Sequence, residues 1–135
     1  MSRLLFLNLP VADLQASRAF FEGLGFEFDR RLSGEGAGCM VVGGQAYVML
    51  LRRDCFARFV TRPVANPALS TALTVAVTAE SRAEVDALAD AALAAGAAPG
   101  KGPQEFGFMY QRSFHDLDGH LWEILWMDQP GSEES

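Results

Sequence analysis

Two stretches of similar sequence decide the fold of this chain: GQAYVMLL, from Gly44 to Leu51, and GHLWEILW, from Gly119 to Trp126. Each begins with glycine, carries an aromatic residue three positions later and leucine six positions later, and continues as an apolar run. The segments before them match as well, because residues 5–13 and 73–81 each read as a strand that leads into a helix at a capping residue. The chain is therefore predicted to contain one module twice, and a site in such a repeat is built from equivalent positions of both copies.

The composition of the 135 residues is that of a single globular domain, with 50% hydrophobic and 21% charged residues. The net charge of −6 offers no electrostatic footprint for nucleic acid and disfavours acidic lipid surfaces. No apolar run approaches the roughly 20 residues that span a bilayer. The two cysteines, Cys39 and Cys55, show neither metal nor redox spacing. We therefore expect a cytoplasmic protein with no nucleic-acid or membrane partner.

The first module is predicted to span residues 3–52 as one strand, one helix and three further strands. Asp13 is the expected N-cap of the helix, because apolar residues follow it at helical spacing, and Gly23 and Gly25 are expected to end the helix. Glycine pairs mark the turns between the later strands. The four strands are expected at residues 3–9, 26–31, 38–42 and 46–52.

A linker is predicted at residues 53–70, with a short helix near residues 55–59, and the second module is predicted at 71–128. Ser81 and Glu84 have the spacing of a capping box, and Gly96 is expected to end the helix that they begin. Prolines and glycines make residues 97–103 a weak strand or a loop. The remaining strands are expected at residues 72–78, 108–115 and 120–127, followed by a polar tail at 129–135.

Three motifs, NLPVADL at residues 8–14, FFEGLGF at 20–26 and DLDGHLWE at 116–123, resemble the vicinal oxygen chelate superfamily. That group includes glyoxalase I, bleomycin-resistance proteins, fosfomycin-resistance enzymes and extradiol dioxygenases, and the chain is most similar to a branch labelled predicted lactoylglutathione lyase. The resemblance covers roughly residues 3–128. It implies an α+β fold of two βαβββ modules, with curved mixed sheets around a central cavity, and a homodimer. Whether the modules pair within one chain or between two stays open.

The resemblance also implies four metal-ligand positions, one on the first and one on the last strand of each module. They fall on Phe6, Val48, Thr74 and Glu123, of which only Glu123 is a good ligand. A catalytic metal usually needs three protein ligands, and a shifted alignment that includes Asn8 would supply only a second oxygen. No cofactor is therefore expected, and a divalent metal at Glu123 is the alternative.

Glu123 needs an explanation of its own, because both faces of its predicted strand are largely apolar. A carboxylate there is costly unless it is paired, hydrogen-bonded or protonated. One interpretation makes it a general acid or base, or the polar anchor of a pocket. The other makes it a former ligand that a structural partner such as Arg112 or Tyr110 holds in place.

Tyr110 and Arg112 lie two positions apart in one predicted strand and therefore share a face. If that face is the concave one, they would meet Glu123, and arginine would offer a planar fork for a carboxylate or phosphate. The alternative is a purely structural pairing of Arg112 with acidic residues. Phe56 and Phe59 are candidates for the mouth of the cavity, although aromatic residues at such spacing are more often core.

Three functions follow from these observations. The first is a small-molecule-binding protein, in which Phe6 and Val48 convert a metal site into an apolar pocket. The second is a metal-dependent lyase or isomerase of lactoylglutathione-lyase type, or a dioxygenase, that uses Glu123 as a base. The third is an interaction protein that kept the fold without a pocket. We expect the first, with a ligand that the sequence does not identify.

Overall fold

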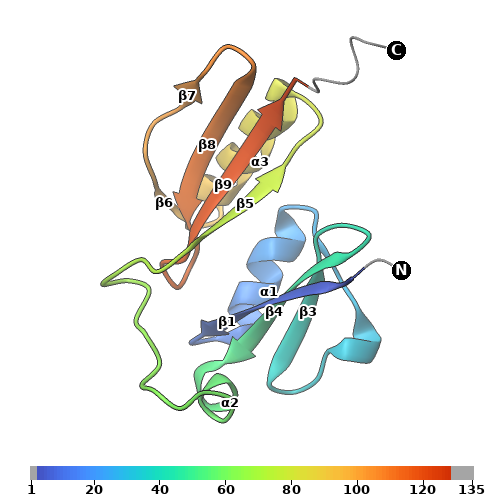
Figure 1. The fold of residues 1–135 in the computed structure, drawn as a ribbon, viewed down its shortest axis with the longest axis vertical. Coiled ribbons are helices and arrows are strands. Elements are labelled where there is room, and N and C mark those ends of the chain that lie inside the picture. Colours follow the sequence, from blue (N-terminus) through green and yellow to red (C-terminus); the bar gives the residue numbers. More distant parts are fainter. Residues whose placement is uncertain (1–2, 129–135) are drawn as a thin grey trace. The chain divides into compact units, whose positions relative to one another are not determined.

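The computed structural model describes residues 3–128, and the chain divides between Asn66 and Pro67 into two compact units. Each unit begins with a strand and a helix and continues with further strands of a mixed sheet (Figure 1), three in the first unit and four in the second, where Gln104–Glu105 adds a short strand. The α+β fold of two modules of βαβββ type predicted from the sequence is confirmed. Unit one is the part before this division, and unit two is the part after it. None of the helices in the described residues is long and apolar enough to cross a membrane.

Unit one holds a four-stranded sheet in the order β1-β4-β3-β2, in which β1 and β4 are parallel and the other pairs are antiparallel. Helix α1 packs against β3 and β4, and the short helix α2 lies beside β1 and β4. The elements are β1 (Leu5–Val11), α1 (Leu14–Gly23), β2 (Glu27–Phe28), the 3-10 helix η1 (Arg30–Leu32), β3 (Ala37–Val41), β4 (Ala46–Arg52) and α2 (Arg53–Ala57).

Unit two holds a five-stranded sheet in the order β5-β9-β8-β6, and β7 also pairs with β8. Helix α3 covers one face and contacts β8 and β9 (Figure 1). Phe114 and Trp122 are fully buried on that face, and Val85 of α3 is buried with them. The elements are β5 (Thr74–Thr78), α3 (Arg82–Ala94), β6 (Ala98–Pro99), β7 (Gln104–Glu105), β8 (Met109–His115) and β9 (Leu121–Met127).

Both helix starts predicted from the sequence are confirmed. The Asp13 side chain accepts a hydrogen bond of 3.0 Å from the N–H of Ala16 at the start of α1. Ser81 Oγ accepts one of 3.1 Å from the N–H of Glu84 at the start of α3. The returning half of the capping box differs by one residue, because Glu84 Oε1 accepts from the N–H of Glu80, at 2.9 Å, and not from that of Ser81. Ser81 therefore satisfies one free amide of the first turn, and Glu84 satisfies the amide of the residue before the cap.

The turn between β8 and β9 is organised by a buried carboxylate. Asp116 is only 6% exposed, and its Oδ1 accepts hydrogen bonds from the N–H groups of Asp118, Gly119 and His120 at 3.0, 3.1 and 3.0 Å. Its Oδ2 accepts a bond of 2.9 Å from Trp122 Nε1. Asp116 therefore ties the turn to the core residue of β9 next to Glu123, and so helps to fix the register that positions the candidate site.

Candidate functional site

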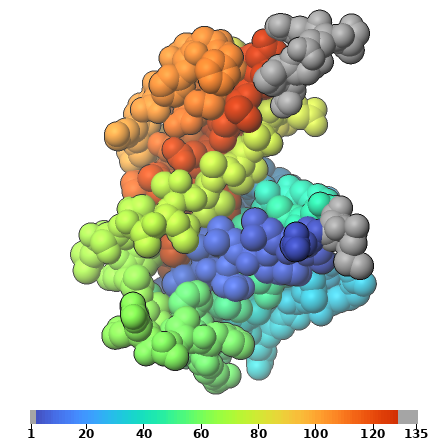
Figure 2. All heavy atoms as spheres, viewed as in Figure 1, coloured from blue at the N-terminus to red at the C-terminus, as the bar shows by residue number. Residues whose placement is uncertain are grey.

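A pocket of about 460 Å³ lies on the face of the unit-two sheet that α3 leaves uncovered. Strands β5, β8 and β9 face the viewer on this side of unit two in Figure 2. The pocket is bounded on one side by residues 99–104, which run from β6 to β7 along the outer edge of β8. We call this segment the 99–104 connection. The lining residues are Pro99, Gly100, Lys101, Gln104, Gln111, Ser113, His115, Leu121 and Glu123.

Glu123 lies on this face because β9 alternates, with Trp122 and Ile124 buried and Glu123 half-buried between them. Its carboxylate accepts two hydrogen bonds. Thr74 Oγ1 of β5 donates to Oε1 at 2.9 Å, and Gln111 Nε2 of β8 donates to Oε2 at 3.3 Å. A carboxylate can accept about four bonds, so this one is oriented from both neighbouring strands and keeps acceptor capacity for a ligand.

The neighbours of Glu123 on β8 are polar. Ser113 is directly paired with Glu123, and Gln111 and His115 are the next residues on the same face. Gln111 Nε2 also donates to Gln104 Oε1 at 3.1 Å, which links the Glu123 carboxylate to β7. His115 Nδ1 lies 3.1 Å from the carbonyl oxygen of Gly119. A carbonyl only accepts, so in the neutral ring the proton is on Nδ1 and Nε2 is an acceptor.

The 99–104 connection approaches β8 closely at Gly100. The N–H of Gly100 donates to the carbonyl oxygen of Ser113 at 3.3 Å, and Ser113 Oγ donates to that of Lys101 at 3.4 Å. A Cβ at Gly100 would collide with Ser113 Oγ. Glycine at this position therefore allows Lys101 to border the pocket.

Of the predicted site residues, Thr74 and Glu123 are brought together by their hydrogen bond. They are the first-strand and last-strand positions of the second module. The contact exists because β5 and β9 are parallel neighbours in which Ala76 pairs with Glu123, and Thr74, two residues earlier, shares its face. The functional role of this pair stays a prediction.

The assignment of Val48 as the counterpart of Glu123 is wrong. Val41 pairs with Tyr47 in one hairpin and His115 pairs with Leu121 in the other. Five residues separate the members of each pair, which makes Met49 the equivalent of Glu123. Val48 is 3% exposed and belongs to the core. Matching Gly44 with Gly119 shifted the alignment by one residue, and in a strand a shift of one residue moves every side chain to the other face.

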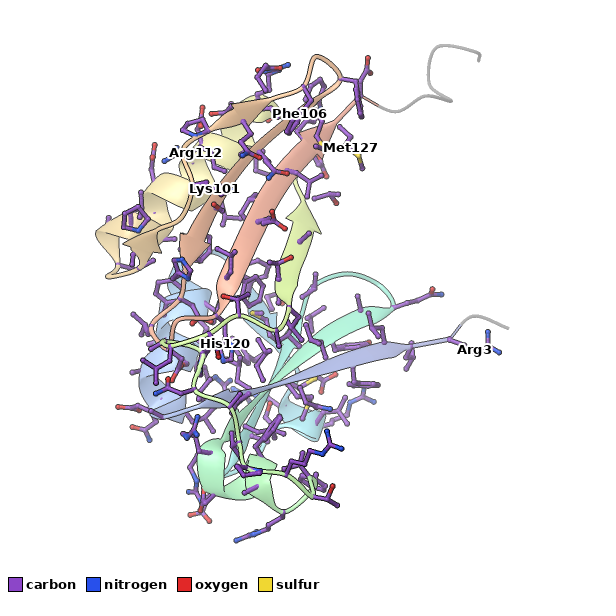
Figure 3. The ribbon with its side chains drawn as sticks, turned by 60° about the vertical axis from the view of Figure 1, so that its left-hand side comes forward. Arg3, Lys101, Phe106, Arg112, His120 and Met127 are labelled. Carbon is purple, nitrogen blue, oxygen red and sulfur yellow. The ribbon has the colours of Figure 1, made fainter. Side chains whose placement is uncertain are left out.

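The expectation that Tyr110 and Arg112 meet Glu123 is also wrong. These residues pair with Trp126 and Ile124 and therefore lie on the face that α3 covers. Arg112 lies beside α3 (Figure 3), and its Nη1 donates to Asp86 at 3.1 Å and to Asp90 at 2.8 Å, both on that helix. Their role is to tie β8 to α3, which is the structural alternative that the sequence left open.

Tyr110 strengthens this link between β8 and α3. Its hydroxyl donates to Asp86 Oδ1 at 2.6 Å. This hydrogen bond, followed by that from Arg112, lowers the pKa of Asp86. The same bond raises the pKa of Tyr110, because it favours the protonated phenol.

The other predicted pocket residues gather in unit one, in a separate pocket of about 540 Å³. Phe6 stacks on Tyr47 with ring centroids 4.9 Å apart. Asn8 pairs with Met49 on the same face of the sheet, and α2 and the residues after it supply the other wall. Because Asn8 is the one polar side chain of the lining, this pocket suits an apolar group. The lining residues are Phe6, Leu7, Asn8, Met49, Leu51, Phe56, Phe59 and Val60.

The two pockets belong to different units. One cavity lined by both modules, as the resemblance implies, stays a prediction. The residues that the sequence analysis missed are the polar ones around Glu123: Lys101, Gln104, Gln111, Ser113 and His115. The alternation of side chains along β8 could have identified Gln111 and Ser113 as pocket residues, since they lie on the face opposite Tyr110 and Arg112.

The side chains at the four implied metal positions do not fit a metal ion. With the corrected register they are Phe6, Met49, Thr74 and Glu123, and only one of these is a carboxylate or imidazole. Within residues 3–128 no group of three or more His, Cys, Asp or Glu side chains is arranged to hold a metal. Divalent metals in catalytic sites commonly take three such ligands.

Comparison with known proteins agrees with this architecture. The family model described as Glyoxalase/Bleomycin resistance protein/Dioxygenase superfamily matches residues 3–124. Solved structures with the same fold include a hypothetical protein from S. aureus, with 26% identity, a TM-score of 0.79 and coverage of 93% of this chain and 94% of that one. No relative was found among curated proteins.

Two further structures with this fold carry functional descriptions. One is a lactoylglutathione lyase from Agrobacterium tumefaciens, with 20% identity, a TM-score of 0.66 and coverage of 93% of this chain and 94% of that one. The other is a genomically encoded fosfomycin resistance protein from Listeria monocytogenes, with 21% identity, a TM-score of 0.65 and coverage of 93% of each chain. At these identities the likeness concerns the fold. Together with the match over residues 3–124, it shows that the chain belongs to the glyoxalase/bleomycin resistance protein/dioxygenase superfamily.

Proposed function

We propose that the protein binds a small organic molecule in the unit-two pocket, with Glu123 as the polar anchor and without a metal ion at that carboxylate. The observation that carries the proposal is the orientation of Glu123 by Thr74 and Gln111 inside a pocket of about 460 Å³. A carboxylate held in place by its neighbours is preorganised to accept hydrogen bonds from a ligand, because little side-chain entropy is then lost on binding.

The apolar pocket of unit one supports a binding function as well. Phe6, Phe56 and Phe59 offer aromatic surface, and Asn8 offers a donor and an acceptor beside it. An apolar lining with a single polar group is typical of small-molecule sites. The superfamily resemblance also supports a homodimer, and a mass close to 14.6 kDa in sedimentation equilibrium would contradict that assignment.

Replacement of Glu123 tests the proposal. A library of small fragments is screened against metal-free protein by ¹H-¹⁵N correlation spectra, and fragments that shift signals of β8 and β9 are titrated. Glu123→Gln should weaken their binding about tenfold to 150-fold, because a hydrogen bond to a charged group contributes about 1.5–3 kcal/mol. Thr74 and Gln111 can still bond the amide, so this variant should fold normally.

Tyr110→Phe is the matched control, since it removes a hydroxyl from the opposite face of the same sheet. It should lower the free energy of unfolding by about 1 kcal/mol and leave fragment binding unchanged. Equal affinities of the wild type and Glu123→Gln for every fragment found in the pocket would contradict the proposal.

A second candidate function is a lyase or isomerase in which Glu123 moves a proton. It is favoured by the presence of His115 and Glu123 in one pocket. They are diagonal neighbours on adjacent strands, with their Cβ atoms about 7–8 Å apart, so a substrate between them would meet two groups able to exchange protons. One variant distinguishes the two proposed functions. Glu123→Gln should lower turnover about 10²-fold to 10⁴-fold with little change in binding if Glu123 is a base, and should weaken binding itself if it is an anchor.

A further inference from the structure

The pocket of unit two is lined by residues of opposite charge. Its lining includes three titratable side chains, Lys101, His115 and Glu123. Lys101 is the only lysine among the 135 residues, whose other ten basic side chains, not counting histidine, are arginines. The lining therefore includes the one lysine of the chain and, in Glu123, one carboxylate residue.

The two charged residues approach the pocket from opposite sides of β8. Glu123 lies on β9 and pairs directly with Ser113 of β8. Lys101 lies on the 99–104 connection, where it is labelled in Figure 3, and its carbonyl oxygen accepts from the hydroxyl of that same Ser113. Neighbouring strands are about 4.8 Å apart, so the backbones that carry the two charges are separated by about 10 Å.

The side chains between these charges are uncharged and can both donate and accept. Ser113, Gln104 and Gln111 line the floor and one side of the pocket. Glu105, which lies four residues after Lys101, already forms an ion pair with Arg82 of α3. Lys101 and Glu123 are therefore the two lining residues of this pocket that carry a charge of fixed sign.

From this juxtaposition we propose that the pocket selects a zwitterionic ligand, with an amine directed to Glu123 and a carboxylate or similar anion directed to Lys101. The separation of the two charged residues favours an ω-amino acid over an α-amino acid, in which the two charges are adjacent. This inference rests on the proposed binding function and names its ligand class. The ammonium of lysine is a mobile donor on a flexible stem, which suits the closing of a pocket around the anionic end.

The single lysine also provides the probe. Reductive ¹³C-methylation keeps the charge of Lys101 and gives one side-chain signal, beside that of the amino terminus, and Lys101→Arg identifies it by removing it. The protein is titrated with 6-aminohexanoate, hexanoate, hexylamine and glycine while this signal and the amide signals of β8 and β9 are followed. 6-Aminohexanoate should bind about fivefold more tightly than either compound with one charged end, because a partly exposed ion pair contributes up to about a fivefold gain.

Two variants separate the two ends. Lys101→Gln should remove the advantage of 6-aminohexanoate over hexylamine, and Glu123→Gln should remove its advantage over hexanoate. Arg62→Gln, an exposed residue of unit one, is the control for net charge and should change neither ratio.

Each contrary result has its own meaning. Equal binding of the zwitterion and the singly charged compounds, or an unchanged preference in Lys101→Gln, would overturn the zwitterion proposal. If the fragment screen still finds ligands that depend on Glu123, the proposed function stands without it. If neither the screen nor this series gives binding in the pocket, both proposals fail.

Discussion

Gly119→Ala is expected to lower the free energy of unfolding by about 3 kcal/mol, which combines backbone strain with a steric clash. Gly119 has a φ of +103°, which side-chain-bearing residues rarely adopt. A Cβ there would lie 2.9 Å from Ala68 Cα, Ala68 N and Pro67 O, all of them backbone atoms that cannot rotate away. The loss should be measured by urea denaturation, as a lower midpoint with an unchanged slope.

Two other glycines separate these contributions. Gly107 has a φ of +81° with no heavy atom within 4 Å of a Cβ, so Gly107→Ala should cost only the backbone strain, about 1 kcal/mol. Gly43 has open space and no positive φ, so Gly43→Ala should change stability by less than about 0.5 kcal/mol. If Gly119→Ala were no more destabilising than Gly107→Ala, the segment at Ala68 would have to move freely away from the turn.

Asp116→Ala is expected to be the most damaging substitution in unit two, with a loss of about 4 kcal/mol. The substitution removes the carboxylate that accepts from the N–H groups of Asp118, Gly119 and His120 and from the indole N–H of Trp122, and of these the Gly119 N–H keeps its bond to the carbonyl oxygen of residue 116. Trp122 is fully buried, so water does not replace the lost bond at its nitrogen. Urea denaturation measures the loss, and the indole N–H signal of Trp122 should shift. A loss below about 1 kcal/mol would contradict this role.

The pH dependence of stability provides a second measurement on Asp116. Burial raises its pKa above the ordinary value of 3.8, against the opposing effects of His120 and of the hydrogen bonds. The native state then holds the proton at a pH where the unfolded state has released it. The corresponding stability is fully present below about 3.8 and is lost as the pH rises through the folded pKa. In Asp116→Asn the stability should not fall in this way as the pH rises. If the wild type and Asp116→Asn showed the same dependence of stability on pH, the raised pKa of Asp116 would be contradicted.

The features that depend on local chemistry were predictable from the sequence. Asp13 and Ser81 cap their helices because a short side-chain oxygen before an apolar periodic run satisfies the first free amides wherever it occurs. Strand β4 has the predicted bounds of residues 46–52. The short helix after it begins at Arg53, two residues earlier than predicted, since it follows β4 without a linker.

The face that each strand residue occupies was not predictable from the same patterns. Strands β4 and β8 have hydrophobic or long side chains on both faces, so alternation alone did not show which set α1 or α3 would cover. Arg112 stayed a candidate for the pocket face for this reason, while Val48 was placed by the match of Gly44 with Gly119. The register of each hairpin decides the question, and it depends on pairing across the turn, which a match between glycines does not determine.

The polar lining of the unit-two pocket depends on chain segments that are distant in sequence. Lys101 borders the pocket only because Gly100 allows the 99–104 connection to lie against Ser113. In the sequence this segment has prolines and glycines around one lysine, which predicts a loop but not its position beside β8. The set of residues that line the pocket is therefore determined by strand pairing, which the sequence did not reveal. Glu123 could be identified from the sequence because a carboxylate in an apolar strand needs an explanation.

Calorimetric titration of metal-stripped wild-type protein and Glu123→Gln with Zn²⁺ tests the central claim most directly. The claim is that Glu123 anchors an organic ligand through its own hydrogen bonds and does not belong to a metal site. One carboxylate beside the hydroxyl of Thr74 and the amide of Gln111 offers too few good ligands. We predict no binding tighter than about millimolar in either protein. Stoichiometric, micromolar binding in the wild type that disappears in Glu123→Gln would contradict this account and favour the metal-dependent chemistry of the superfamily.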